Sequence, residues 1–361
     1  MLSRLWWTRL VNSARFLDEV QDALMEGQSI LLSFESEIPW KETMLETLEQ
    51  KLLDMTDSRT FDVIDAGEVK PASSGRDKFH AGRCLLERYC SREEQKKYWP
   101  TTHGRPECFL AQSSDTTLNS RFVCVTGINQ KNLSMWTESV SEYISACEEG
   151  KEHGVFILVA ECPAATTPKP LLLKKYADYV SDYDCMMLCL TVISEIKCGK
   201  AEKMYLCEAA SNIARGNVEL AGLLASEGLK LIQQPESVAA SVFRKNGIGI
   251  EGLHERVRMA IWEAQIKLVF PKLENFRAQI IRKYESRLLG YLPIRSSNND
   301  SVDNAIDLEI GQLYYLCKNN AAARITSLEE FEKIRKMRDA RNMLAHWDPL
   351  TYEKLKDLGV L

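Results

Sequence analysis

Residues 29–55, "SILLSFESEIPWKETMLETLEQKLLDM", predict a strand, a loop and a helix in that order. The apolar run at residues 29–34 has the length of a buried strand, and the segment that begins at Lys41 has the length of a helix. The same order recurs along the first part of the chain, with strands expected at residues 60–67, 121–129 and 154–162. Strands that alternate with helices pair in parallel. Residues 1–165 are therefore expected to form an α/β domain with three layers around a parallel sheet.

The rest of the chain is expected to be helical. "PAATTPKP" at residues 163–170 marks a boundary, and residues 166–248 predict an all-α linker domain. Residues 249–361 predict an all-α bundle, whose long first helix is expected to kink at Pro271. Its last long helix is expected to begin at a capping box of Ser327 and Glu330 and to end before Pro349.

Composition limits the classes of function. The 361 residues carry a formal net charge of -5, whereas a nucleic-acid binder that ignores sequence is usually basic, so any RNA contact must be local. The 11 cysteines form no CxxC pair and there are only 5 histidines, so neither a metal nor another cofactor is expected. Unpaired cysteines fit the reducing cytoplasm, and no apolar run has the length of a membrane span. A cytoplasmic protein without membrane contact is the prediction.

The loop after the first strand stands where a phosphate-binding loop would lie. Such a loop has the pattern GxxxxGK[ST], because bare backbone N–H groups must approach the phosphates. Here Lys41 takes the place of the lysine, but Glu35 and Trp40 replace the glycines and Glu42 replaces the hydroxyl that holds magnesium. The order and lengths of the elements resemble a P-loop signalling (STAND-type) ATPase domain over residues 4–162. The resemblance implies a degenerate domain that has lost its nucleotide chemistry; a domain unrelated to P-loops and a retained phosphate site at Lys41 are the alternatives.

The apolar stripe of the last long helix contains an arginine. Ile334, Met337, position 341 and Leu344 follow the three- and four-residue spacing of a buried seam, and position 341 is Arg341. A buried arginine needs a partner or a cleft, because burial of an unpaired charge is costly. His346 follows five residues later, about 140° around the helix, so that both side chains can border one groove.

The segment "RNMLAH" at residues 341–346 resembles the R-x4-H signature of the HEPN superfamily, including the polar residue after the arginine. The resemblance covers a helical region from about residue 253 to residue 361. It implies metal-independent RNA cleavage, in which the 2′-hydroxyl attacks the adjacent phosphate. His346 would act as general acid or base, Arg341 would stabilise the charge that develops on the phosphate, and Asn342 would orient the scissile phosphate or the histidine. The resemblance also implies a homodimer through the C-terminal bundle, because the chain has one motif and the family places two face to face.

Other interpretations of these residues remain open. Arg335, Lys336 and Arg338 would guide the RNA backbone, or they form an ordinary solvated face. Arg341 would alternatively pair with an acidic residue such as Asp307 or Glu309, and many HEPN-like bundles are silent interaction modules.

The arrangement of domains predicts a sensor joined to an effector. The N-terminal domain would sense or bind a protein partner, and the C-terminal bundle would cut RNA, as in prokaryotic antiphage defence or toxin systems. The alternatives are a catalytically silent scaffold subunit of a larger complex and a switch regulated by a nucleotide at Lys41.

Overall fold

The structure is a computed structural model that describes residues 1–69, 80–295, 301–319 and 326–361. The chain forms two compact units, residues 1–184 and 185–361. The boundary expected near residue 165 falls inside the first unit, and the one expected near residue 248 falls inside the second.

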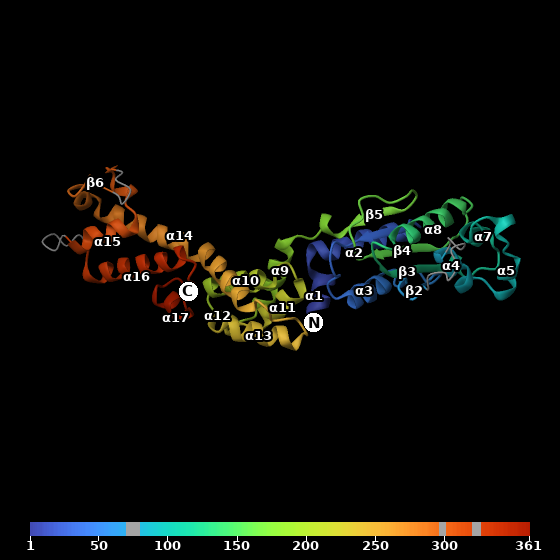
Figure 1. Cartoon of the computed structure of the whole chain (residues 1–361), viewed down its shortest axis with the longest axis horizontal. Helices are drawn as coiled ribbons and strands as arrows, with labels where there is room; N and C mark the ends of the chain where they lie inside the picture. Colours follow the sequence, from blue (N-terminus) through green and yellow to red (C-terminus); the bar gives the residue numbers. More distant parts are fainter. Residues whose placement is uncertain (70–79, 296–300, 320–325) are drawn as a thin grey trace. The chain divides into compact units, whose positions relative to one another are not determined.

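The first unit contains a parallel sheet of five strands in the order β2-β3-β4-β1-β5 (Figure 1). The four strands expected from the sequence are confirmed. They are β1 (Ile30–Ser33), β2 (Thr60–Asp65), β3 (Arg121–Ile128) and β4 (Val155–Ala160). Every residue of β1 and β4 is buried, which explains why these strands appear in the sequence as uninterrupted apolar runs.

The fifth strand, β5 (Leu172–Lys175), corrects the expectation that only helices follow residue 165. It pairs in parallel with β1, with Ile30 opposite Leu172 and Ser33 opposite Lys175. All four of its residues are partly buried, and the strand lies at the edge of the sheet. Such a strand shows neither a continuous apolar run nor a clear alternation, so sequence periodicity does not reveal it.

Helices cover both faces of the sheet, which confirms the expected three layers. On one face, α1 (Leu2–Arg9), α2 (Val11–Met25) and α3 (Lys41–Leu53) pack against one another, with α2 against β1 and α3 against β2. On the other face, α4 (His80–Tyr89), α7 (Pro106–Gln112) and α8 (Leu133–Ala146) share an apolar core with the strands. The short helices α5 (Arg92–Lys97) and α6 (Pro100–His103) complete this side.

The second unit is mostly helical. Its helices, after α9 (Asp182–Ile193) at the boundary, are α10 (Lys200–Ala214), α11 (Val218–Ser226), α12 (Leu229–Gln233), α13 (Pro235–Lys245), α14 (Leu253–Leu289), α15 (Ile310–Asn319), α16 (Leu328–Ala345) and α17 (Tyr352–Asp357). The described part of this unit also contains one short antiparallel pair of strands, β6 (Ile294–Arg295) and β7 (Ser301–Val302).

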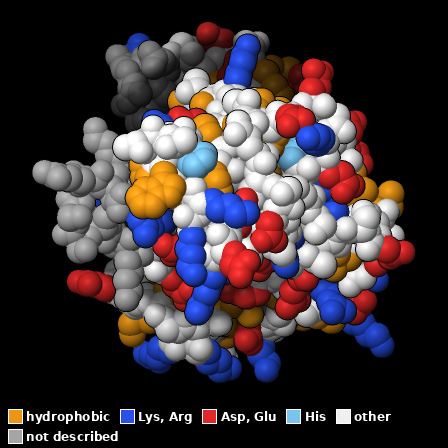
Figure 2. All heavy atoms as spheres, turned by 90° about the vertical axis from the view of Figure 1, so that its right-hand side faces the viewer, with side chains coloured by type: hydrophobic (Ala, Val, Ile, Leu, Met, Phe, Trp, Pro, Cys, Tyr) orange, Lys and Arg blue, Asp and Glu red, His pale blue; other side chains and the backbone are white. Residues whose placement is uncertain are grey.

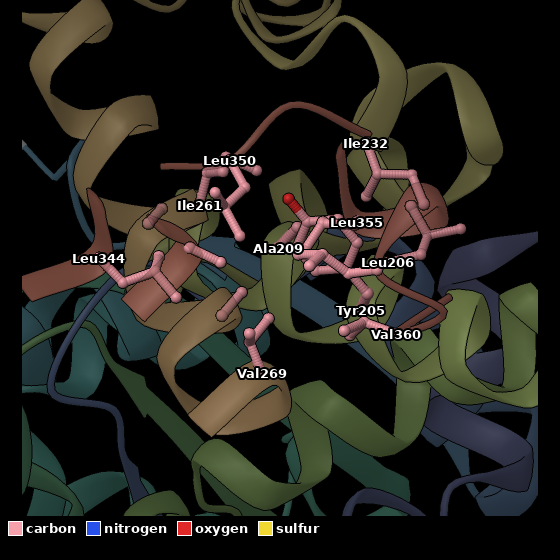
Figure 3. Packing of buried hydrophobic residues seen from close by; sticks show 14 of the residues in the cluster. Tyr205, Leu206, Ala209, Ile232, Ile261, Val269, Leu344, Leu350, Leu355 and Val360 are labelled. Atoms are coloured by element: carbon pink, nitrogen blue, oxygen red, sulfur yellow. The ribbon is translucent and has the colours of Figure 1, made fainter. Parts of the chain in front are cut away.

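One apolar core joins the expected linker to the C-terminal helices. Figure 3 shows Leu206 and Ala209 of α10 close to Leu350, Leu355 and Val360 at the end of the chain. The buried side chain of Gln265 on α14 donates to the Tyr205 hydroxyl and the Leu350 carbonyl, each at 2.8 Å, and accepts from the Leu350 amide at 2.7 Å. This side chain therefore fixes the chain just after α16 to both α10 and α14.

Helix α14 continues through Pro271 with helical backbone dihedrals and leaves the helical range at Tyr284 instead. The interruption is expected at Pro271 because proline lacks an amide hydrogen. The non-helical residue, Tyr284, lies 13 residues later. Among the described residues, no helix is long and apolar enough to cross a membrane.

Candidate functional site

The residues of the R-x4-H motif lie at the C-terminal end of α16. The helix begins with the expected capping box, in which the Glu330 amide donates to the Ser327 hydroxyl and the Glu330 carboxylate accepts from the Ser327 amide. Hydrogen bonds from Lys283 and from the Tyr284 hydroxyl on α14 lower the pKa of Glu330 to about 2. The start of α16 is therefore held to α14 by a charged contact as well as by its cap.

The buried seam of α16 differs from the expected one at one position. Ile334, Met337, Ala340 and Leu344 are buried, whereas the Arg341 side chain is 43% exposed. Positions 340 and 341 are neighbours on the helix surface, and the small apolar alanine takes the buried place. Arg341 is thus a residue at the margin of the helix interface and not a buried arginine.

Arg341 has acidic and amide neighbours. Its Nη2 lies 3.7 Å from Glu309 Oε2, just before α15, which is one of the two partners considered from the sequence. Its Nη1 lies 3.5 Å from Asn342 Oδ1, a long contact. Asn342 and His346 are exposed. All three motif residues therefore reach solvent on the last two turns of α16.

The three basic residues proposed to guide RNA each contact an acidic residue. Arg335 lies 2.6 Å from Glu332 and Lys336 lies 2.7 Å from Asp357. Arg338 contacts Asp339 at 2.5 Å and lies over the ring of Tyr314 at 3.8 Å, and the hydrogen bond to Asp339 raises the pKa of Arg338. The surface of α16 consequently has little uncompensated positive charge from these residues.

Two tryptophans adjoin the motif, and none of the sequence patterns above predicts a role for them. Trp347 follows His346 directly, is 56% exposed, and stacks on Trp262 of α14 with ring centroids 5.3 Å apart and an interplanar angle of 21°. Trp262 Nε1 donates to the Leu344 carbonyl at 2.7 Å, and Arg258 donates to the Trp347 carbonyl at 3.0 Å. A tryptophan just past the end of a helix, where glycine is usual, was the available signal.

Trp347 has a left-handed backbone conformation, with φ of 62°. The Asp348 amide donates to the Met343 carbonyl and the Trp347 amide donates to the Leu344 carbonyl, which is the Schellman arrangement. A side chain other than glycine costs about 1–2 kcal/mol in this conformation. The neighbouring Trp262 and Arg258 hold Trp347 in place in spite of this cost.

Lys41 is the first residue of α3 and lies near the carboxyl ends of β1 and β4. Its Nζ is 2.5 Å from Oε1 of Glu161, the residue that follows β4, and both side chains are about one-third exposed. Trp40 before it is also left-handed, with φ of 43°. The carboxyl edge at a change of strand order is the usual ligand position in such sheets, but here a carboxylate already contacts the lysine.

No group of three or more histidine, cysteine, aspartate or glutamate side chains suited to hold a metal ion occurs in the described part of the chain. The chain matches no family model, and no curated protein matches it. The resemblance to the HEPN superfamily thus rests on the R-x4-H motif and its place on α16.

Proposed function

We propose that the C-terminal helical region is a HEPN-like bundle and that the protein is a metal-independent endoribonuclease. The observation that carries the proposal is the accessibility of Arg341, Asn342 and His346 at one end of α16. None of the three side chains is buried in the apolar core, so each is accessible to a substrate. The weak, exposed contact between Arg341 and Glu309 leaves the guanidinium available to a phosphate.

The chemistry needs a proton acceptor, a proton donor and a fixed positive charge. The 2′-oxygen of the RNA forms a bond to phosphorus as His346, acting as base, takes its proton. The bond from phosphorus to the 5′-oxygen breaks, and that oxygen receives a proton from a general acid. Arg341 stabilises the charge on the phosphoryl oxygens through its forked donors. A second copy of the motif in a homodimer would supply the second histidine.

The proposed biological role is that of an effector in a prokaryotic defence or toxin system in the cytoplasm. The α/β unit would bind a protein partner in place of a nucleotide, since its Lys41 is paired with Glu161. RNA is the proposed substrate, and no nucleotide cofactor takes part.

A cleavage assay in EDTA tests the proposal. Single-stranded RNA is incubated with the wild type, His346→Ala, Arg341→Ala and, as a matched control, His254→Ala. His254 is an exposed histidine that pairs with Glu236 at 3.1 Å, in the same unit. We expect a loss of at least about 100-fold with the first two variants, cyclic-phosphate ends on the products, and wild-type cleavage with the control. Cleavage that neither motif substitution changes would refute the assignment.

A silent scaffold subunit is the second candidate function. It is favoured by the acidic partners of Arg335, Lys336, Arg338, Arg341 and Lys41, because paired cations offer less to a phosphate backbone. The same assay separates the two candidates, since a scaffold gives no cleavage in the wild type.

A further inference from the structure

We propose that Trp347 is a stacking platform for one unpaired base of the RNA substrate, beside His346. The inference rests on the proposed function and deepens it, because it assigns a preference for single-stranded RNA to the same site. It starts from the position of Trp347, which takes the left-handed place that glycine occupies at most helix ends of this type. A strained conformation that exposes a large aromatic ring is a feature that its surroundings must hold in place.

The surroundings fix the ring before any ligand binds. Trp262 lies against one face of the Trp347 indole, and its own Nε1–H is tied to the Leu344 carbonyl. Arg258 holds the Trp347 carbonyl. Because one face is covered and the side chain is still 56% exposed, the accessible area belongs to the other face and the edge. A rigid exposed aromatic face loses little entropy when a base stacks on it.

A base fits this surface better than a protein partner does. Apart from Trp262, which covers one face, the residues next to Trp347 in the sequence are polar or small, and Ala345, His346 and Asp348 are all exposed. Protein docking would need a contiguous apolar patch. The other exposed large apolar side chains described in this unit lie on other segments: Met187, Ile250, Leu289, Ile306, Tyr315 and Leu328.

The neighbouring charges suit a nucleotide. Arg258 donates to the Trp347 carbonyl at 3.0 Å, and Arg341 lies six residues before Trp347, near the end of α16. Their acidic contacts, at 3.6 Å to Glu255 and 3.7 Å to Glu309, are long. A base on Trp347 would therefore bring its phosphates near Arg258, with His346 as the adjacent residue. On the first unit, Figure 2 shows basic and acidic side chains interspersed over the face near α5 and α7.

The test measures affinity separately from cleavage. The probe is a fluorescent, unstructured oligoribonucleotide with 2′-O-methyl groups, which lacks the attacking hydroxyl. Its Kd is determined by anisotropy for the full-length wild type, Trp347→Gly, Trp347→Phe and Trp99→Ala. Glycine suits the left-handed conformation, so Trp347→Gly keeps the helix end. Trp99 is a matched control, since it is 64% exposed and belongs to the other unit.

We expect Trp347→Gly to weaken binding about 5- to 100-fold, Trp347→Phe to weaken it less, and Trp99→Ala to leave it unchanged. Equal affinity of the wild type and Trp347→Gly would overturn the platform. Cleavage that depends on His346 would then still support the proposed function. Conversely, the oligonucleotide could bind in a way that depends on Trp347 while the wild type cleaves no RNA. That result supports the platform and refutes the nuclease assignment. A change of sedimentation with Trp347→Gly at unchanged affinity would identify a dimer contact and overturn the platform.

Discussion

The ammonium group of Lys41 lies 2.5 Å from the carboxylate of Glu161, at the carboxyl edge of the parallel sheet. Lys41 is the residue that the sequence pattern compares with a P-loop lysine. Glu161 follows the fully buried strand β4, so its backbone position is fixed by the sheet. An internal carboxylate in this place gives the lysine a structural role without a ligand.

We predict that neither ATP nor GTP with magnesium produces binding heat in calorimetry, with the wild type or with Lys41→Ala. Glu161→Gln should release the lysine and still give no heat, because the loop lacks glycines and contains Glu35 and Glu42. The ion pair itself should contribute at most about 1 kcal/mol to stability, since it is partly exposed. Heat in the wild type that disappears in Lys41→Ala would contradict this prediction.

Glu309 should restrain Arg341. Replacement by glutamine removes the negative charge next to the guanidinium, so we expect Glu309→Gln to tighten binding of the 2′-O-methyl oligonucleotide about 2- to 5-fold. The effect should vanish in an Arg341→Ala background, where there is no guanidinium to release. Glu329→Gln, on the first turn of α16, is the control for net charge. An equal gain in affinity for both glutamine variants would show that binding responds only to the net charge of the protein.

Glu107 on α7 should make stability depend on pH. Its side chain is fully buried, its two carboxyl oxygens have no hydrogen-bond partner in the described part of the chain, and burial raises its pKa above the ordinary value of 4.5. The folded state therefore holds the proton more tightly than the unfolded state. Its favourable contribution is present below the unfolded pKa and is lost as pH rises through the folded pKa.

The measurement is denaturant unfolding of the wild type and Glu107→Gln between pH 4 and pH 8. The glutamine variant should lose less stability over this range, because its neutral amide does not ionise. Glu93→Gln, an exposed position on α5, should follow the wild-type profile. Parallel profiles for the wild type and Glu107→Gln would show that folding does not shift the pKa of Glu107.

Gln265 should contribute strongly to the stability of the second unit. Gln265→Leu preserves volume but leaves the Tyr205 hydroxyl and both backbone groups of Leu350 without their partner, so we expect a loss of about 2–4 kcal/mol in the free energy of unfolding. Gln279→Leu, an exposed position on the same helix, should change stability by less than about 0.5 kcal/mol. Similar losses for the two variants would show that the buried network is not stabilising.

The sequence predicts the sheet better than it predicts the site, for physical reasons. Strands β1, β3 and β4 are found because they form apolar runs, whereas β5 is missed because its two leucines are followed by two lysines and all four residues are only partly buried. On α16 the spacing of apolar residues cannot decide between positions 340 and 341, and only packing shows that Ala340 is buried. The stacking of Trp262 on Trp347 joins residues 85 positions apart, which no local pattern reveals.

The position of β1 between β4 and β5 has a consequence for synthesis of the protein. Ile30 pairs with Ile157 and with Leu172, so its partners are translated 127 and 142 residues later (157 − 30 and 172 − 30). At about 5–20 residues per second, this strand emerges from the ribosome roughly 6–25 s before its first neighbour. During that interval neither edge of the strand has its native neighbour. The nascent chain therefore carries a strand with unpaired edges, to which a chaperone could bind.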